Sequence, residues 1–191
     1  MDNSKNILVV GAGLIGTSIA MGLQSAGFHV FLEDASSEAL ATACDKSGAR
    51  EYSSNQDVDV AFVATPPQAV SAVIHALVKN HPQAVVTDVA SVKGAIFDSL
   101  SDLAPQELSR IVGGHPMAGR EVSGAAGAQA NLFVDRPWVL IRNDHSSEAS
   151  IGVVRDLVSL LGAIPLERNV REHDQAVALV SHTPQVIASV L

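Results

Sequence analysis

The sequence predicts an α/β fold, in which a doubly wound and mostly parallel sheet is covered by helices on both faces. Strand-like and helix-like segments alternate along most of the chain, and the connections between them are short. Several of the strand-like segments are continuous apolar runs, as is typical of strands that are buried on both faces. We expect a sheet domain over residues 1–168 and the beginning of a helical domain over residues 169–191.

The first strand and the turn after it form the segment ILVVGAGLIGTS at residues 7–18. Gly11, Gly13 and Gly16 have the spacing G-x-G-x-x-G. In this pattern the first glycine permits a tight turn, the second lets a diphosphate approach the backbone, and the third lets the helix pack closely on the strand. A helix expected over residues 17–26 would offer free N–H groups and a positive dipole end to the phosphates. The segment therefore predicts a dinucleotide site of the Rossmann type, with an ordinary strand–helix turn as the alternative.

The remaining elements follow from apolar periodicity and from turn residues. We expect further strands at residues 29–33, 48–52, 58–64, 84–87, 110–114, 137–142 and 163–166, and helices at residues 37–46, 68–79, 92–103, 123–131 and 146–161. Ser36 is the expected N-cap of the helix at 37–46. A last helical pattern covers residues 170–191; Pro184 should kink it, and it stops without a capping signal.

Polar or small residues follow the carboxyl ends of several strands, where open α/β sheets bind their ligands. Gly13, Asp34, Thr65 and Ser91 should therefore line one crevice. The candidates for cofactor binding are Gly11, Gly13, Leu14, Ile15, Gly16, Asp34, Thr65, Pro66 and Ala90. Asp34 lies 18 residues beyond Gly16, near the position where a carboxylate binds the ribose 2′-hydroxyl of NAD and repels the 2′-phosphate of NADP. NAD is therefore favoured, although serines at positions 36 and 37 leave NADP open.

His115 is the main candidate for chemistry. It follows Gly113 and Gly114 and precedes Pro116, so its backbone is restricted and close approach is possible. Histidine can accept a proton near neutral pH, although a histidine in a loop is often only structural. Ser91 could hydrogen-bond a substrate, or it could be the N-cap of the helix expected at 92–103.

Several other polar residues have a structural explanation as well as a functional one. We expect Lys93 to be a solvated residue of a first helical turn, and His173 and Asp174 to begin the last helix. His182 lies on a polar stripe with Gln185, which suits either substrate binding or an exposed surface. No metal site is expected, because His173 and His182 face opposite sides of a common helix and no paired-cysteine or H-E-x-x-H pattern occurs.

Composition limits the classes of partner. The net charge of −8 argues against nucleic acid or an anionic membrane as the main partner. Cys44 is the single cysteine, which excludes an internal disulfide and fits a reducing compartment. No signal peptide or membrane-length apolar run is evident, so a cytoplasmic location is expected. Charged residues make up only 17% of the chain, which suggests that a partner covers some apolar surface.

In combination, these motifs resemble the prephenate/arogenate dehydrogenase family of tyrosine biosynthesis. The matching pieces are VVGAGLIGTS at 9–18, ATPP at 64–67, TDVASVKG at 87–94, GGHPMAGRE at 113–121, NLF at 131–133 and HDQAVALVSHTPQ at 173–185. The resemblance implies an oxidative decarboxylation: hydride passes from a hydroxyl-bearing ring carbon to NAD(P)+, carbon dioxide departs, and the ring becomes aromatic. It also implies a small-molecule substrate, prephenate or arogenate.

The resemblance assigns roles to particular residues. His115 would take or polarise the hydroxyl proton, Ser91 would hydrogen-bond the same oxygen, and His182 would contribute from the substrate side. Gln185 stands where prephenate-using members often have histidine, which slightly favours arogenate. Family members continue as a helical domain that pairs two subunits and supplies an arginine for the substrate carboxylate. Only its first helix would be present here, so a homodimer is expected for the full-length form.

Two alternatives remain at this stage. A shortened, catalytically impaired homologue could act only as a nucleotide-binding module. Another member of the β-hydroxyacid dehydrogenase group could use a different base, but the segments DVASVK and GGHPMAG would then have no explanation.

Overall fold

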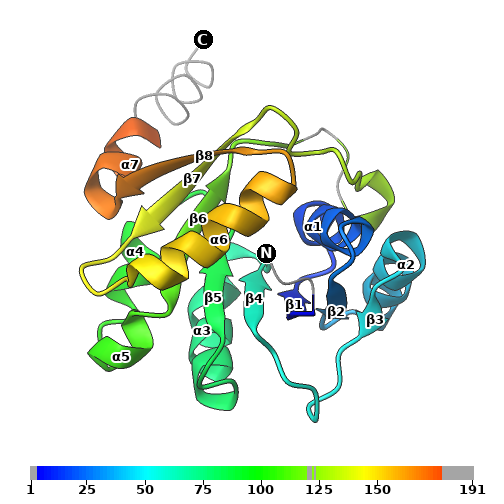
Figure 1. The fold of residues 1–191 in the computed structure, drawn as a ribbon, viewed down its shortest axis with the longest axis horizontal. Helices are drawn as coiled ribbons and strands as arrows, with labels where there is room; N and C mark the ends of the chain where they lie inside the picture. Colours follow the sequence, from blue (N-terminus) through cyan, green and yellow to red (C-terminus); the bar gives the residue numbers. More distant parts are fainter. Residues whose placement is uncertain (1–3, 120–121, 123, 178–191) are drawn as a thin grey trace.

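The computed structural model describes residues 4–119, 122 and 124–177, and within them the strands form one sheet of eight (Figure 1). The strands are β1 (Asn6–Val10), β2 (His29–Glu33), β3 (Arg50–Glu51), β4 (Val60–Val63), β5 (Val85–Asp88), β6 (Ile111–Pro116), β7 (Pro137–Arg142) and β8 (Ile164–Asn169). Their spatial order is β3-β2-β1-β4-β5-β6-β7-β8. Neighbouring strands are parallel, except that β6 and β7 are antiparallel. The predicted doubly wound, mostly parallel sheet is confirmed.

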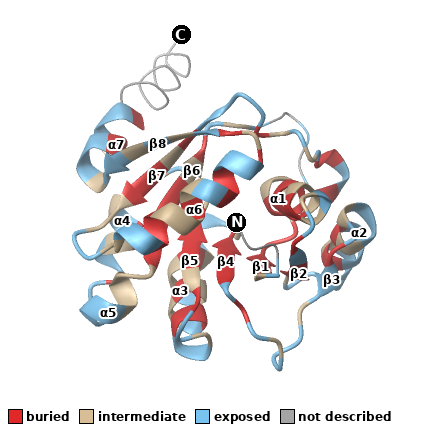
Figure 2. Ribbon diagram, viewed as in Figure 1, coloured by how far each residue is buried: buried red, intermediate tan, exposed pale blue. Residues whose placement is uncertain are grey.

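Helices cover both faces of this sheet. They are α1 (Leu14–Ser25), α2 (Ser37–Ser47), α3 (Pro67–Asn80), α4 (Gly94–Asp98), α5 (Pro105–Leu108), α6 (Glu148–Leu160) and α7 (Val170–Val177), with a 3-10 turn, η1, at Ala125–Gly127. Alternate residues of β1 divide the core. Ile7 and Val9 pack with residues of α1 and α6, whereas Leu8 and Val10 pack with residues of α3 and α4. Figure 2 shows the buried residues concentrated in the central strands. This two-sided burial explains why the strands lack apolar–polar alternation.

Several predicted bounds agree with the structure. The strands at 29–33 and 137–142 have the predicted ends. Ser36 caps α2, and its hydroxyl oxygen accepts a hydrogen bond from the Ala39 amide at 3.3 Å. The helix expected at 17–26 begins earlier, at Leu14, so that Gly16 lies within its first turn.

Two predicted helices are wrong. The helix expected over 92–103 is confined to α4, after which the amides of Leu100 and Leu103 form three-residue turns with the carbonyls of Phe97 and Leu100. A new helix then starts at Pro105, and the residue before a proline disfavours the helical conformation. The helix expected over 123–131 is only the turn η1, which follows Gly124 at φ +79°.

None of the helices within the described ranges combines the length and apolar character that a membrane span requires.

Candidate functional site

The turn between β1 and α1 and the first turn of α1 contain three glycines, which differ in the space that the structure leaves for a Cβ atom. Gly11 has φ +112°, and a Cβ there would lie 2.4 Å from the Ala64 carbonyl oxygen. A Cβ on Gly16 would lie 1.9 Å from the carbonyl oxygen of Gly11, so only glycine permits this packing of helix on turn. A Cβ on Gly13 would meet nothing within 4 Å. The second glycine therefore faces open space, where a diphosphate could approach the backbone.

A cavity of about 1310 Å³ opens beside this turn. It is lined by the cofactor candidates Gly11, Gly13, Asp34, Thr65 and Pro66, and one wall is formed by apolar residues of α3, among them Ala69, Val73 and Leu77. The described lining includes the acidic Glu33 and Asp34 but no lysine or arginine. Such a lining fits the 2′-hydroxyl of NAD better than the phosphate of NADP.

Two polar groups at this cavity are suited to a nucleotide. The carboxylate of Asp34 is held by backbone amides: Oδ2 accepts from Ala12 at 2.7 Å and Oδ1 accepts from Ser36 at 2.8 Å. The buried Oγ1 atom of Thr65 has no hydrogen-bond partner within the described residues. A bound nucleotide could satisfy this hydroxyl, so the residues present fit the predicted cofactor.

Other cofactor candidates lie outside the described lining of the cavity. Leu14, Ile15 and Gly16 form the first turn of α1, where Gly16 is buried. Ala90 is buried in the loop after β5. Their contact with a cofactor stays a prediction.

His115 lies within β6, not in the loop expected after it, and is half-buried. Because β6 is parallel to β5, His115 is at the same edge of the sheet as the residues that follow β1, β2, β4 and β5. The neighbouring Gly114 permits this packing, since a Cβ there would lie 2.4 Å from the Asp88 carbonyl oxygen. His115 Nδ1 is 2.9 Å from His173 Nε2, and the two rings meet edge to face.

The imidazole of His115 is electrically neutral near pH 7. The pKa of His115 is lowered to about 4, mainly by burial and in addition by the nearby His173 and Lys93. The carboxylate of Asp174 acts in the opposite direction. A histidine with this pKa is available to accept a proton over the physiological range.

The predicted start of the last helix at residue 170 is confirmed, whereas the prediction that His173 and Asp174 merely begin this helix is wrong. The helix α7 begins at Val170, and Asn169 caps it by accepting from the Glu172 amide at 2.9 Å. His173 is only 3% exposed, and its Nδ1 lies 2.8 Å from Asp174 Oδ1. A signal was available in the sequence, since His173 lies four residues before the buried Val177 and so shares its side of the helix.

Asp174 binds the beginning of α4, a helix that is distant in sequence. Its Oδ1 accepts from the Lys93 amide at 3.2 Å and its Oδ2 accepts from the Gly94 amide at 2.7 Å. Burial raises the pKa of Asp174, but the hydrogen bonds from His173 and from these two amides outweigh burial, and the net shift is downward. The carboxylate is therefore ionised. Ser91 is not the N-cap of this helix; it is exposed in the loop between β5 and α4.

Lys93 contradicts the expectation of a solvated side chain. It precedes α4, is completely buried, and donates from Nζ to the carboxylate of Asp88 and to the Ala90 carbonyl at 2.8 Å. Burial lowers the pKa of Lys93, and the attraction of Asp88 opposes this effect. Asp88 also accepts from the Ala90 amide at 3.0 Å. The buried pair of Lys93 and Asp88 thus holds the backbone of Ala90, next to Ser91, at the carboxyl end of β5.

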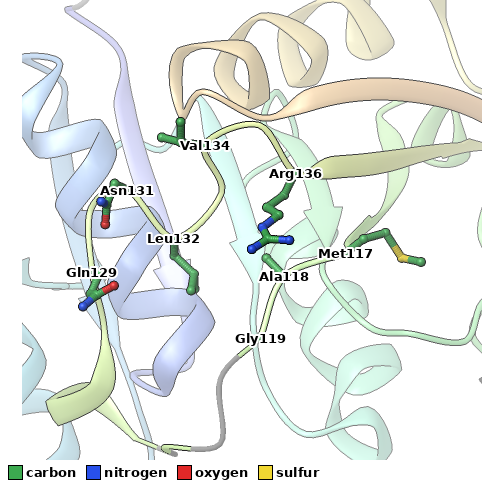
Figure 3. A pocket seen from close by; sticks show the side chains of 8 residues that line it. All are labelled: Met117, Ala118, Gly119, Gln129, Asn131, Leu132, Val134 and Arg136. Carbon is green, nitrogen blue, oxygen red and sulfur yellow. The ribbon is translucent and has the colours of Figure 1, made fainter.

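A smaller hollow of about 390 Å³ lies along the segment that follows His115 (Figure 3). Met117, Ala118 and Gly119 form one side, and the loop carrying Gln129, Asn131, Leu132, Val134 and Arg136 forms the other. Arg136 extends its guanidinium over Ala118. The hollow therefore has a positive charge close to the segment that follows β6, the strand that carries His115.

Two predicted substrate residues, His182 and Gln185, lie outside the described residues, as does Pro184. Within the described ranges, no group of three or more His, Cys, Asp or Glu side chains is arranged to hold a metal ion.

Comparison with known proteins gives a consistent result. Residues 19–165 match the family described as the nucleotide-binding domain of prephenate dehydrogenase. The chain is 35% identical over 182 residues to a Streptomyces niveus protein named "Probable prephenate dehydrogenase NovF", covering 95% of this chain and 50% of that protein. The chain thus spans about half the length of three of the curated relatives it matches.

Two solved structures are similar along nearly the whole chain. The arogenate dehydrogenase of Synechocystis is 33% identical with a TM-score of 0.84, covering 94% of this chain and 65% of that one. The prephenate dehydrogenase of Aquifex aeolicus, in complex with hydroxyphenyl propionate and NAD+, is 26% identical with a TM-score of 0.88, covering 97% and 67% of the two chains.

Proposed function

The chain belongs to the prephenate dehydrogenase family, whose nucleotide-binding domain it contains, and on that premise we propose that it serves an NAD-dependent oxidative decarboxylation. The substrate is a cyclohexadienyl acid, prephenate or arogenate. The observation that carries the proposal is the neutral, half-buried imidazole of His115 at the same sheet edge as the glycine turn. A base and a nucleotide cradle at one edge are what hydride removal from an alcohol carbon requires.

The cofactor is held by the β1–α1 turn and by the groups around the large cavity. Backbone amides at the start of α1 would bind the diphosphate, and Asp34 would bind the ribose hydroxyls. The Thr65 hydroxyl, which has no partner within the described residues, would form a hydrogen bond with the nucleotide. The acidic lining excludes the 2′-phosphate of NADP. Bound NAD supplies the hydride acceptor.

The protein residues handle the proton and the substrate. As the C–H bond at the hydroxyl-bearing carbon gives up its electron pair as hydride, His115 accepts the hydroxyl proton and Ser91 hydrogen-bonds the same oxygen. The ring carboxylate leaves as carbon dioxide, its bonding electrons complete the aromatic ring, and the phenolate oxygen recovers a proton. His182 and Gln185 contact the remainder of the substrate, and the full-length form pairs as a homodimer.

Steady-state kinetics with prephenate and arogenate, each against NAD+ and NADP+, tests this proposal. We expect NADH formation together with carbon dioxide release, and a preference for NAD+. Absence of turnover with all four combinations, while NADH still binds, would favour the second candidate, a nucleotide-binding module without catalysis.

A further inference from the structure

We propose that Asp174 and His173 are positioning residues that fix the tautomer of His115, so that His115 Nε2 carries the lone pair that accepts the proton. The three side chains form a continuous chain of hydrogen bonds from α7 to β6. The tautomer follows from these contacts together with a singly protonated His173. Its use in catalysis rests on the proposed function.

The first step concerns the contact between Asp174 and His173. Two backbone amides donate to the Asp174 carboxylate and fix its orientation. An ionised carboxylate can only accept, so the hydrogen bond at 2.8 Å requires a proton on His173 Nδ1. This contact therefore decides which nitrogen of His173 is the donor.

The second step passes the constraint to His115. A neutral imidazole with a proton on Nδ1 is an acceptor at Nε2. His173 is 3% exposed, and we take its ring to carry a single proton, the one on Nδ1 that the contact with Asp174 requires. At 2.9 Å, His115 Nδ1 must then donate to His173 Nε2. Nε2 of His115 is left without a proton.

The third step concerns the charge that appears during the reaction. When Nε2 accepts a proton, His115 Nδ1 still donates to His173, and the negative charge of Asp174 stabilises the imidazolium. The titratable groups that face His115 are His173 and Asp174 from α7 and Lys93 from the loop before α4, which is itself paired with Asp88. Asp174 alone favours the charged form. The same carboxylate also holds the amides of Lys93 and Gly94, so it positions the loop of Ser91 together with the base.

Nitrogen-15 NMR of the histidine side chains tests the tautomer on the whole chain without cofactor or substrate. The His115 signals are assigned by their loss in His115→Gln. In the wild-type chain at pH 7 we expect a protonated Nδ1 and an unprotonated Nε2 on His115, and a protonated Nδ1 on His173. In Asp174→Asn a single oxygen remains for three donors, the Lys93 amide, the Gly94 amide and His173 Nδ1, so the preference of His115 for the Nδ1 proton should weaken. Glu172→Gln removes the same charge from an exposed position on the same helix, and it should leave the spectrum unchanged.

A proton on Nε2 of His115 in the wild-type chain, or a doubly protonated His173, would overturn the proposal even if Asp174→Asn failed to fold. Where turnover is measurable, Asp174→Asn should lower kcat by about 10²-fold with little change in KM, whereas Glu172→Gln should not. An equal loss in both variants would also overturn it. Complete absence of turnover in the wild-type chain would remove the proposed function but would leave the NMR result standing, so the two failures are distinguishable.

Discussion

The two ends of the candidate site are built in different ways. At the nucleotide end, the β1–α1 turn is shaped by backbone geometry. Gly16 packs so closely on the backbone of Gly11 that it leaves no room for a Cβ atom. At the histidine end, side chains from distant elements meet: His115 contacts His173, 58 residues away, and Lys93 contacts Asp174, 81 residues away. Figure 1 shows α7 near α4, although residues 99–169 separate them in sequence.

This difference sets what each region tolerates. A turn made of backbone is sensitive to a side-chain atom added at Gly11 or Gly16, but its binding groups are N–H groups that substitutions elsewhere do not remove. A network of buried side chains is sensitive to the loss of one partner, because the others are left without hydrogen bonds or with an uncompensated charge. Substitutions at the histidine end should therefore affect chemistry and folding, while those at the nucleotide end should affect affinity and cofactor choice.

The variant His115→Asn should show the largest difference between the two ends, because it should affect turnover but not nucleotide binding. Removing the proton acceptor should lower turnover by about 10²-fold or more, while the affinity for NADH, measured by fluorescence titration, stays unchanged because the cradle is built from other strands. Turnover at the wild-type rate would remove His115 from its proposed role. A parallel loss of NADH affinity would show that the two ends are not separate.

Lys93→Met should have the largest effect on folding. It leaves the carboxylate of Asp88, which is 1% exposed, without its counter-charge, and such a loss costs about 3–5 kcal/mol in the free energy of unfolding. Urea denaturation measures it. Lys79→Met, at an exposed position of α3, is the matched control and should change little. The double variant Lys93→Met with Asp88→Asn should recover most of the loss; no recovery would mean that the charge is not its cause.

The same contrast explains what the sequence could predict. The nucleotide end could be predicted from the spacing of a few residues, because the strand, turn and helix that form it are continuous in sequence. These residues are Gly11, Gly13, Gly16 and Asp34. The parallel sheet and the placement of His115 at its carboxyl edge could be predicted for the same reason.

The inward orientation of Lys93 could not be predicted in this way. It depends on where α4 begins, and that point is fixed by Asp174 from the far end of the described chain. The burial of His173 likewise requires knowing that α7 packs near β6. Local propensity treats a lysine before a helix and a histidine within one as surface residues, and only tertiary contacts reverse that expectation.

At the nucleotide end, a moderate effect is expected from Asp34→Ala. Loss of a charged acceptor for the ribose hydroxyls should weaken NADH binding by about tenfold or more. The ratio of the affinity for NADH to that for NADPH should also decrease. Titrations with both nucleotides measure this change. Asp34→Asn keeps an oxygen for the Ala12 amide and removes the charge, so it separates support of the turn from recognition of the ribose. Unaltered preference in both variants would mean that another residue distinguishes the nucleotides.

The smallest effect is expected in the dependence of stability on pH, and it comes from the histidine end. His115 has a pKa of about 4 in the folded chain, against an ordinary value of 6.5. Between these values the unfolded chain binds a proton that the folded chain does not, so stability present above pH 6.5 is lost as the pH falls toward 4. One group contributes at most about 1.4 kcal/mol per pH unit, and the partial exposure of His115 reduces this.

Urea denaturation of the wild-type chain and of His115→Gln from pH 4 to 7 isolates this contribution, because the substitution should flatten the acid side of the curve. His75→Gln is the matched control, because the contribution of His75 to stability should depend on pH in the opposite direction. The hydrogen bond from His75 to Asp102 raises the pKa of His75, so its contribution is present at low pH and is lost as the pH rises through that pKa. If His115→Gln left the acid slope intact, the imidazole would titrate normally, and the desolvated base that distinguishes the histidine end from the nucleotide end would not exist.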